Sequence, residues 1–314
     1  MSLYKNTLLL ESIDYSEKSI KAYQSIGKLY TLNPGFINYS DINILIIRLG
    51  TFIDNSFLAK FPNLEIIASP TTSLTHIDIS VINNESIKIF SLRDCFDKIL
   101  SITSTSELTV GLTIDLVRRI SSYSNSILTE SVWNRDLYKT RQISSMSIGI
   151  IGLGRVGNIV ANVFNAFGSN VTYCDIDERV ESDIAERVNK NKLLSSSDII
   201  ILCASWFHND PCILDEDDFA LIKANTLIVN SSRAEVINHK CLIKSIKSRK
   251  ISGYATDVLP IQYENNNVKS HELLKLYKEG YNIIITPHIG GRTTDAMSYT
   301  EDCIADLVLS HYKL

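Results

Sequence analysis

The stretch IGIIGLGRVGNIVANVFNAFGSNVTYCDID, residues 148–177, decides the fold. It opens with an apolar run, 148–151, that is typical of a buried β-strand. Glycines follow at 152, 154 and 157 in the spacing GxGxxG, and a segment with helical apolar spacing leads from there to Gly168. The apolar face of that predicted helix consists of Ile159, Val160, Val163, Phe164 and Phe167. A second strand-like run, 170–174, completes a predicted βαβ unit.

The glycine turn predicts a dinucleotide site. Gly152 would allow the tight turn, Gly154 would let backbone approach a pyrophosphate, and Gly157 would let helix pack closely on strand. The N–H groups that begin the helix attract anions, so Arg155 and Val156 are also assigned to cofactor binding. Asp175 ends the second strand, where a carboxylate accepts hydrogen bonds from ribose hydroxyls and repels a 2′-phosphate. The predicted cofactor is therefore NAD.

The same alternation of strands and helices extends through the chain. Its 314 residues are 45% hydrophobic and 21% charged, which suits two domains with sizeable cores. A helix is expected over residues 104–120, between two sets of βαβ units, and the last piece, from Gly290, should pack as a helix on the first hundred residues. The expected strands are Thr7–Leu10, Ile42–Ile47, Glu65–Ala68, Lys88–Phe90, Ile148–Ile151, Asn170–Cys174, Ile199–Cys203, Leu227–Asn230, Gly253–Asp257 and Asn282–Thr286.

Charge and composition exclude several classes of protein. The formal net charge is −4, and no basic cluster indicates a nucleic-acid or membrane partner. No apolar run is long enough to span a bilayer and no signal peptide is evident, so we expect a cytoplasmic protein. The six cysteines are scattered without CxxC pairs, so neither a disulfide framework nor a metal site is predicted.

Polar residues at strand ends are the next candidates, because ligands of open parallel sheets bind at the carboxyl ends of the strands. One arginine and one histidine occur there, Arg233 and His288. A guanidinium can hold a carboxylate by two hydrogen bonds, and an imidazole can exchange a proton near neutral pH. Further residues at these ends are assigned to cofactor binding: Cys203, Ala204, Ser231, Ser232, Asp257, Gly290 and Gly291.

Over its whole length the sequence resembles the D-isomer-specific 2-hydroxyacid dehydrogenase family. The motifs that carry the resemblance are STSELTVGLTIDLVRRI (104–120), Trp133, GIIGLGRVG (149–157), NSSRAEVI (230–237), ATDV (255–258) and ITPHIGG (285–291). The resemblance implies an α/β fold with two Rossmann-like domains: a flavodoxin-like substrate domain, 1–102 completed by 290–314, and an inserted NAD-binding domain, 103–289. It also implies an active-site cleft between them and a homodimer through the NAD domains.

By position in the family, Arg233 is the substrate-binding arginine, His288 the acid/base histidine, and Asp257 the aspartate beside the nicotinamide. The family usually has a glutamate five residues after that aspartate, to orient the histidine. Here the residue is Gln262. Formate dehydrogenases of this superfamily use glutamine there, so Gln262 is the in-register partner, and Glu264 is the alternative if the Asn-rich segment shifts the loop.

The substrate loop also departs from the family. In SPTTSLTHID, residues 69–78, Thr71 and Ser73 replace its glycines. Backbone N–H groups of Thr72, Ser73 and Leu74 are expected to meet the substrate carboxylate, in a pocket that the extra side chains reshape.

Together these features predict an NAD-dependent oxidoreductase that interconverts a 2-keto acid and a D-2-hydroxy acid. Phosphoglycerate, hydroxypyruvate or glyoxylate, and lactate substrates stay open. The alternative is an NAD(H)-sensing, co-repressor-like binding protein of the same fold with little turnover, which the missing glutamate favours and the retained Arg233 and His288 oppose.

Overall fold

The chain forms two compact units in a computed structural model. The structure describes residues 4–11, 14–31, 37–82, 85–131, 133–137, 139–207, 210–260 and 268–312. Unit 1 contains the chain up to Ile102, the segment that begins at Phe207, and everything from Gly291 onward. Unit 2 contains Thr103–Trp206 and Asp210–Gly290. The expected α/β class with two domains is confirmed.

Unit 1 is built on a five-stranded sheet in the order β2-β1-β3-β4-β5. Every pair of neighbouring strands is parallel, and β1 lies between β2 and β3. The strands are β1 (Thr7–Leu9), β2 (Leu29–Thr31), β3 (Ile44–Ile46), β4 (Ile66–Ala68) and β5 (Lys88–Phe90). The helices are α1 (Glu17–Ile26), η1 (Tyr39–Asp41), α2 (Asn55–Leu58), α3 (Ile79–Ile82), η2 (Leu92–Ser101) and α11 (Thr294–His311).

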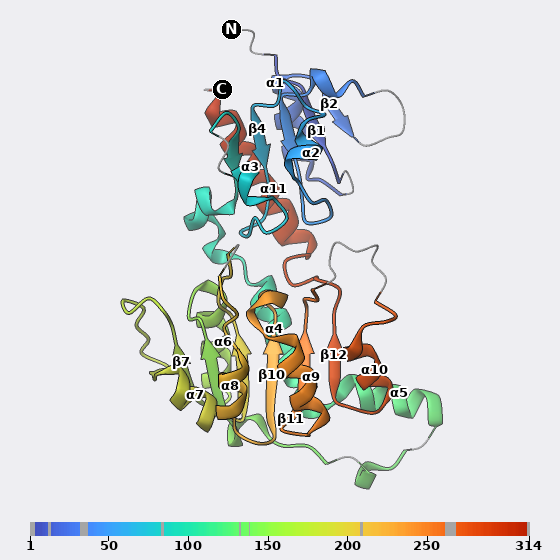
Figure 1. The fold of residues 1–314 in the computed structure, drawn as a ribbon, viewed down its shortest axis with the longest axis vertical. Coiled ribbons are helices and arrows are strands. Elements are labelled where there is room, and N and C mark those ends of the chain that lie inside the picture. Colours follow the sequence, from blue (N-terminus) through green and yellow to red (C-terminus); the bar gives the residue numbers. More distant parts are fainter. Residues whose placement is uncertain are drawn as a thin grey trace. The chain divides into compact units, whose positions relative to one another are not determined.

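Helix α11 completes unit 1 although it comes from the other end of the chain. In Figure 1 it is the red helix among the blue elements, and it packs on α1 and η2. Its buried face contributes Cys303, Ile304, Ala305 and Val308 to one of the two apolar clusters of this unit. The buried Glu301 forms an ion pair with Arg48, and its carboxylate accepts the Ser16 N–H at 2.7 Å. The C-terminal helix is therefore an integral layer of unit 1.

Unit 2 is built on a seven-stranded parallel sheet in the order β12-β11-β10-β9-β6-β7-β8. The chain starts in the middle, at β6, and proceeds outward first in one direction and then in the other. The strands are β6 (Ser147–Ile151), β7 (Asn170–Cys174), β8 (Glu186–Arg187), β9 (Ile199–Leu202), β10 (Thr226–Asn230), β11 (Ile251–Thr256) and β12 (Ile283–Ile285).

Helices cover both faces of this sheet, and each central strand contributes side chains to both resulting cores. In β9, for example, Ile199 and Ile201 join one apolar cluster, while Ile200 and Leu202 join the other. A parallel sheet buried on both faces requires such uninterrupted apolar strands. The helices are α4 (Ser104–Arg118), α5 (Ile120–Glu130), η3 (Arg135–Leu137), η4 (Ile143–Ser145), α6 (Arg155–Ala166), α7 (Lys190–Ser196), α8 (Glu216–Leu221), η5 (Ala234–Val236), α9 (His239–Lys247) and α10 (Glu272–Lys278).

The structure differs from the sequence-based expectations in several local features. The helix expected over 104–120 ends at Arg118, because Arg119 adopts a left-handed conformation with φ of 54°. Phe167, expected on the apolar face of α6, is 50% exposed, since it follows the last helical residue. Two short edge strands, β2 and β8, were not expected.

The unit boundaries differ slightly from the expected ones. Gly290, expected to begin the C-terminal piece, lies in unit 2, where its N–H is hydrogen-bonded to Asp257. Phe207, expected within the central domain, is grouped with unit 1, where its ring lies against Arg93.

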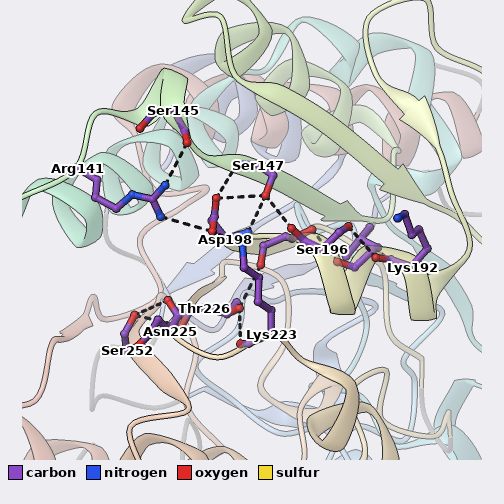
Figure 2. Close-up of polar contacts among 12 residues, drawn as sticks. Arg141, Ser145, Ser147, Lys192, Ser196, Asp198, Lys223, Asn225, Thr226 and Ser252 are labelled. Carbon is purple, nitrogen blue, oxygen red and sulfur yellow. Dashed lines mark hydrogen bonds and ion pairs between the residues drawn. The ribbon is translucent and has the colours of Figure 1, made fainter.

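A charge cluster closes the amino ends of the central strands of unit 2 (Figure 2). Asp198 accepts hydrogen bonds from Lys223 at 2.6 Å and from the Ser147 N–H at 3.0 Å, and Arg141 lies 3.5 Å away. Burial acts to raise the pKa of Asp198, but the hydrogen bonds from Lys223 and Ser147 outweigh it, and the pKa is lowered. This cluster lies at the opposite end of the strands from the expected ligand site, so we assign it to stability.

We expect Asp198→Asn to destabilise the protein by about 1–3 kcal/mol at neutral pH, because it removes a charged acceptor with three donors. A lowered carboxyl pKa contributes stability above the unfolded value of about 4, and this contribution is lost as pH falls through the folded value. The difference in the free energy of unfolding between wild type and variant, measured by urea unfolding, should therefore become smaller below pH 4. Asp183→Asn, at an exposed carboxylate, is the control. A gap that is independent of pH would contradict this role.

Candidate active site

The glycine turn after β6 is packed so tightly that two of its three glycines cannot carry a side chain. Gly152 has φ of +89°, and a Cβ there would lie 2.6 Å from the Ala204 backbone. A Cβ on Gly157 would lie 2.1 Å from the Gly152 oxygen. Gly154 is different, because it is exposed and nothing lies within 4 Å of the place of its Cβ. The turn is therefore tightly packed at Gly152 and Gly157 and open at Gly154, which we call its crest.

Helix α6 starts at this crest without a capping side chain. Its N-cap is Gly154, so the first N–H groups of the helix, beginning at Arg155 and Val156, are not satisfied by a cap. Such a helix end attracts an anion through its N–H groups and its dipole. The crest therefore fits a phosphate or pyrophosphate group.

Asp175, at the end of β7, lies beside the same turn. Its carboxylate accepts the Leu153 N–H at 2.7 Å and the Asp177 N–H at 2.9 Å. Arg187 from β8 donates to the carbonyl oxygens of Asp175, at 2.8 Å, and of Asp177, at 3.0 Å. The carboxylate is thus fixed in place by backbone donors. Sequence reasoning singled out Asp175 but not Leu153 and Arg187, whose contributions depend on backbone positions that only the fold brings together.

The residues after β9 and β10 are largely packed against neighbouring parts of unit 2. Cys203 and Ala204 lie against the glycine turn, and burial raises the pKa of the Cys203 thiol to about 12. The Ser231 hydroxyl is buried and lies 2.6 Å from the Thr109 hydroxyl of α4. Ser231 therefore packs with its side chain inward, and only its backbone is available to a ligand.

Asn230, the last residue of β10, shapes the turn that leads to Arg233. Its side-chain oxygen accepts both the N–H and the hydroxyl of Ser232 at 3.0 Å, and its side-chain N–H donates to the Arg233 carbonyl at 2.8 Å. Sequence reasoning did not single out this buried asparagine. A signal was present, because Asn before serines at a strand end is typical of an Asx turn.

Asp257, the residue after β11, anchors the loop that follows β12. Its buried carboxylate accepts the Thr286 hydroxyl at 2.6 Å, the Ile289 N–H at 2.9 Å and the Gly290 N–H at 2.7 Å. Burial raises the pKa of Asp257 despite these donors. A Cβ on Gly290 would lie 3.0 Å from the carboxylate, so the glycine allows this approach. Asp257 therefore positions the loop on which His288 lies.

His288 lies on that loop in a left-handed backbone conformation with φ of 55°. Its Nδ1 is buried and has no hydrogen-bond partner among the residues that the structure describes. Burial, together with the positive charge of Arg233, lowers the pKa of His288 to about 4. Arg233 follows β10 and His288 follows β12, at the carboxyl ends of the same parallel sheet, and the charge of Arg233 acts on the imidazole. At neutral pH this imidazole is uncharged.

The expected partner of His288 cannot be placed, since Gln262 and Glu264 both lie outside the described residues. Gly291 is described and is exposed, with open space where a Cβ would be, but it belongs to unit 1.

The loop expected to bind a substrate carboxylate follows β4 in unit 1. Thr71 Oγ1 donates to the Ser73 carbonyl at 2.8 Å and lies 2.8 Å from Ser69 Oγ, which is 3.3 Å from the buried His76. The side chains that replace the family's glycines are thus used within the loop. The N–H groups of Thr72, Ser73 and Leu74 donate to no acceptor in the described part of the chain.

The described residues show neither a metal-binding group nor a membrane-spanning helix. They contain no group of three or more His, Cys, Asp or Glu side chains able to hold a metal ion. Within the same ranges, no helix has the length and apolar character needed to cross a membrane. The six cysteines are all free.

A glycine turn with an acidic strand end, in the middle of a doubly wound parallel sheet, defines unit 2 as a dinucleotide-binding domain. Residues 110–290 match the sequence model of the D-isomer specific 2-hydroxyacid dehydrogenase, NAD binding domain. The chain belongs to the D-isomer specific 2-hydroxyacid dehydrogenase family. It is accordingly an NAD-dependent dehydrogenase of the 2-hydroxyacid class, and the expectations of an enzyme and of NAD as its cofactor are confirmed.

Individual relatives agree with this assignment. A Staphylococcus haemolyticus protein named "Putative 2-hydroxyacid dehydrogenase" is 28% identical over 272 residues, which cover 85% of this chain and 81% of that protein. Two solved structures share the fold: D-lactate dehydrogenase from Aquifex aeolicus with NAD and lactic acid (TM-score 0.83, 20% identity, 98% and 96% of the two chains), and NAD-dependent formate dehydrogenase from Staphylococcus aureus with NAD (TM-score 0.81, 20% identity, 98% and 96%). None of these relatives favours the alternative of a sensing protein without turnover.

The interaction between Arg233 and His288 can be tested directly. Arg233→Gln removes a nearby positive charge, so we expect the pKa of His288 to rise by roughly one unit from its value of about 4. NMR titration of histidine-labelled protein measures this, with the His288 signal assigned by its loss in His288→Asn. Lys240→Gln removes an exposed cation of α9 and is the control. A His288 pKa that stays the same or falls in Arg233→Gln would show that the two side chains do not interact.

Proposed function

We propose that this enzyme interconverts a 2-keto acid and a D-2-hydroxy acid, with Arg233 binding the carboxylate and His288 exchanging the proton. The observation that carries the proposal is the position of both side chains after β10 and β12, at the carboxyl ends of the same parallel sheet, where the charge of Arg233 lowers the pKa of His288. NADH supplies the hydride when bound, and the chain supplies the groups that hold and protonate the substrate.

Three features of the glycine turn support a mode of NAD binding: the open crest at Gly154, the uncapped start of α6 and the carboxylate of Asp175. The N–H groups at Arg155 and Val156 would bind the pyrophosphate. Asp175 would accept hydrogen bonds from the adenosine ribose, because its carboxylate is already oriented by the Leu153 and Asp177 N–H groups.

The proton chemistry follows from the charge around His288. An uncharged imidazole is ready to take the proton of an alcohol, which suits oxidation of the hydroxy acid. Reduction requires the imidazolium form, which Arg233 opposes. A substrate carboxylate bound to Arg233 would offset that positive charge and raise the pKa of His288, so substrate binding itself would favour protonation. Gln262, with Glu264 as the alternative, is proposed to orient the imidazole.

The loop after β4 would supply further donors to the carboxylate from the N–H groups of Thr72, Ser73 and Leu74. The nicotinamide ring of the cofactor would be lined by residues at the strand ends of unit 2 and after β12. These are Cys203, Ala204, the backbone of Ser231 and Ser232, Asp257, Gly290 and Gly291. Lactate, glyoxylate, hydroxypyruvate and phosphoglycerate substrates all fit these roles, and D-lactate is the product class of one solved structural neighbour.

We also propose that the enzyme is a homodimer through unit 2. Helix α5 has no buried residue, and large apolar side chains on and beside it are exposed: Ile120 by 54%, Leu128 by 79% and Trp133 by 88%. Exposed large apolar side chains that form a patch are typical of a protein interface.

The function is tested with a panel of 2-keto acids and NADH absorbance. Arg233→Ala should lower kcat/KM for the best keto acid at least a hundredfold while NADH still binds, because the carboxylate loses its cation. Arg233→Lys should recover little, since an ammonium cannot reproduce the bidentate geometry. Lys240→Ala is the control. Unimpaired turnover by Arg233→Ala would remove Arg233 from the mechanism.

Cofactor preference depends on Asp175. We expect the wild type to bind NADH clearly more tightly than NADPH, and Asp175→Ala to narrow the difference by roughly tenfold or more, because the carboxylate both binds the ribose hydroxyls and repels a 2′-phosphate. Fluorescence titration with both cofactors measures it. Asp183→Ala, an exposed acid of the same unit, should change neither affinity. Equal affinity of the wild type for NADPH and NADH would refute the role of Asp175.

A further inference from the structure

The family resemblance assigns no role to Arg93, a residue of unit 1. It lies at the start of η2, directly after β5, and reaches the substrate loop. Its Nε–H donates to the Thr72 carbonyl at 2.9 Å, and its guanidinium carbon lies 4.4 Å from the centre of the Phe207 ring. Stacking on an aromatic ring holds the plane of a guanidinium. Burial lowers the pKa of Arg93, and the charge of the neighbouring Asp94 acts in the opposite direction.

The bond to Thr72 fixes a peptide plane. No described peptide bond is cis, and in a planar trans peptide the C=O and the following N–H point in opposite directions. By holding the Thr72 C=O, Arg93 turns the Ser73 N–H away from itself. A rotation of this peptide would break the bond to Arg93.

The next peptide is held in the same way by a different side chain. Thr71 Oγ1 donates to the Ser73 carbonyl at 2.8 Å, which turns the Leu74 N–H to the opposite side. Two consecutive carbonyls are thus held by side-chain donors, and the two N–H groups paired with them have no acceptor in the described residues. Adjacent unpaired N–H groups of this kind suit a carboxylate oxygen.

We propose that Arg93 is a positioning residue for the carboxylate-binding loop, orienting the Ser73 N–H toward the substrate through its bond to the Thr72 carbonyl. The inference rests on the proposed function, which places the substrate carboxylate at this loop. A carbonyl that accepts a hydrogen bond from a cation polarises its peptide, so the same contact strengthens the Ser73 N–H as a donor. Because the carboxylate is common to all 2-keto acids, the effect is independent of the rest of the substrate.

Kinetics of Arg93→Met test the proposal on the intact enzyme. KM should rise roughly tenfold for pyruvate and by the same factor for 2-ketoglutarate, with kcat within about threefold and NADH affinity unchanged, because a carboxylate contact made in both ground and transition states is weakened. Arg93→Lys, which keeps the charge and a donor but loses the planar Nε–H, should give an intermediate KM. Lys98→Met removes another cation of η2 and is the matched control.

Three kinetic outcomes would overturn the proposal. The first is an unchanged KM for both keto acids. The second is a rise in KM confined to 2-ketoglutarate, which would mean that Arg93 contacts the second anionic group of that substrate directly. The third is a parallel loss of NADH affinity, which would mean general damage to the fold.

A second measurement needs no turnover and separates this inference from the proposed function. The amide ¹⁵N shift of Ser73 reports the hydrogen bond accepted by the Thr72 carbonyl. It should move in Arg93→Met, return part of the way in Arg93→Lys and stay constant in Lys98→Met. A Ser73 signal unaffected by Arg93→Met would refute the positioning role even if the enzyme reduces keto acids. Wild-type protein that reduces no keto acid, with the Ser73 shift moving as expected, would refute the proposed function and leave the bond to the loop established.

Discussion

The burial of both faces of the parallel sheet in unit 2 is the constraint on which the rest of this structure depends. Helices cover the two faces, and the central strands are filled with isoleucine, leucine and valine on both sides. Such a sheet can offer polar chemistry only at its edges and strand ends. At the amino ends, the carboxylate of the partly buried Asp198 accepts hydrogen bonds from Lys223 and Ser147. The carboxyl ends therefore hold the glycine turn, Asp175, Arg233 and the loop of His288.

Those carboxyl ends share one construction. The loops that carry Arg233 and His288 are each held by a polar residue at a strand end: the Asn230 side chain donates to the Arg233 carbonyl, and Asp257 accepts the Gly290 N–H of the loop of His288. The turns are thereby fixed before any ligand arrives, which lowers the conformational entropy lost on binding. The loop after β4 in unit 1 is held in a similar way by a hydroxyl group, since Thr71 donates to the carbonyl of Ser73.

Much of the fold of unit 2 and the positions of its polar strand ends could be predicted from the sequence, because they depend on local sequence patterns. The glycine spacing, the apolar strand before it and the acid after the next strand predicted the turn between β6 and α6, and polar residues after apolar runs predicted that Arg233 and His288 lie at strand ends. Contacts between segments distant in sequence could not be predicted in the same way. The pairing of Thr109 with Ser231 joins residues 122 positions apart, and the break at Arg119 is a backbone conformation that the apolar spacing of 104–120 does not indicate. Phe167 was misplaced because helical periodicity does not show where the last turn of a helix ends.

The left-handed backbone of His288 has a consequence for how this site is maintained. A residue with a Cβ is less stable in that conformation than glycine by roughly 1–2 kcal/mol, and asparagine tolerates it better than histidine. Selection for folding alone would therefore drive this position toward Gly or Asn. Because the strain is compensated by the three donors that Asp257 accepts from the same loop, the histidine and the aspartate are energetically linked. Replacement of Asp257 would therefore weaken the loop that holds His288 in its left-handed conformation.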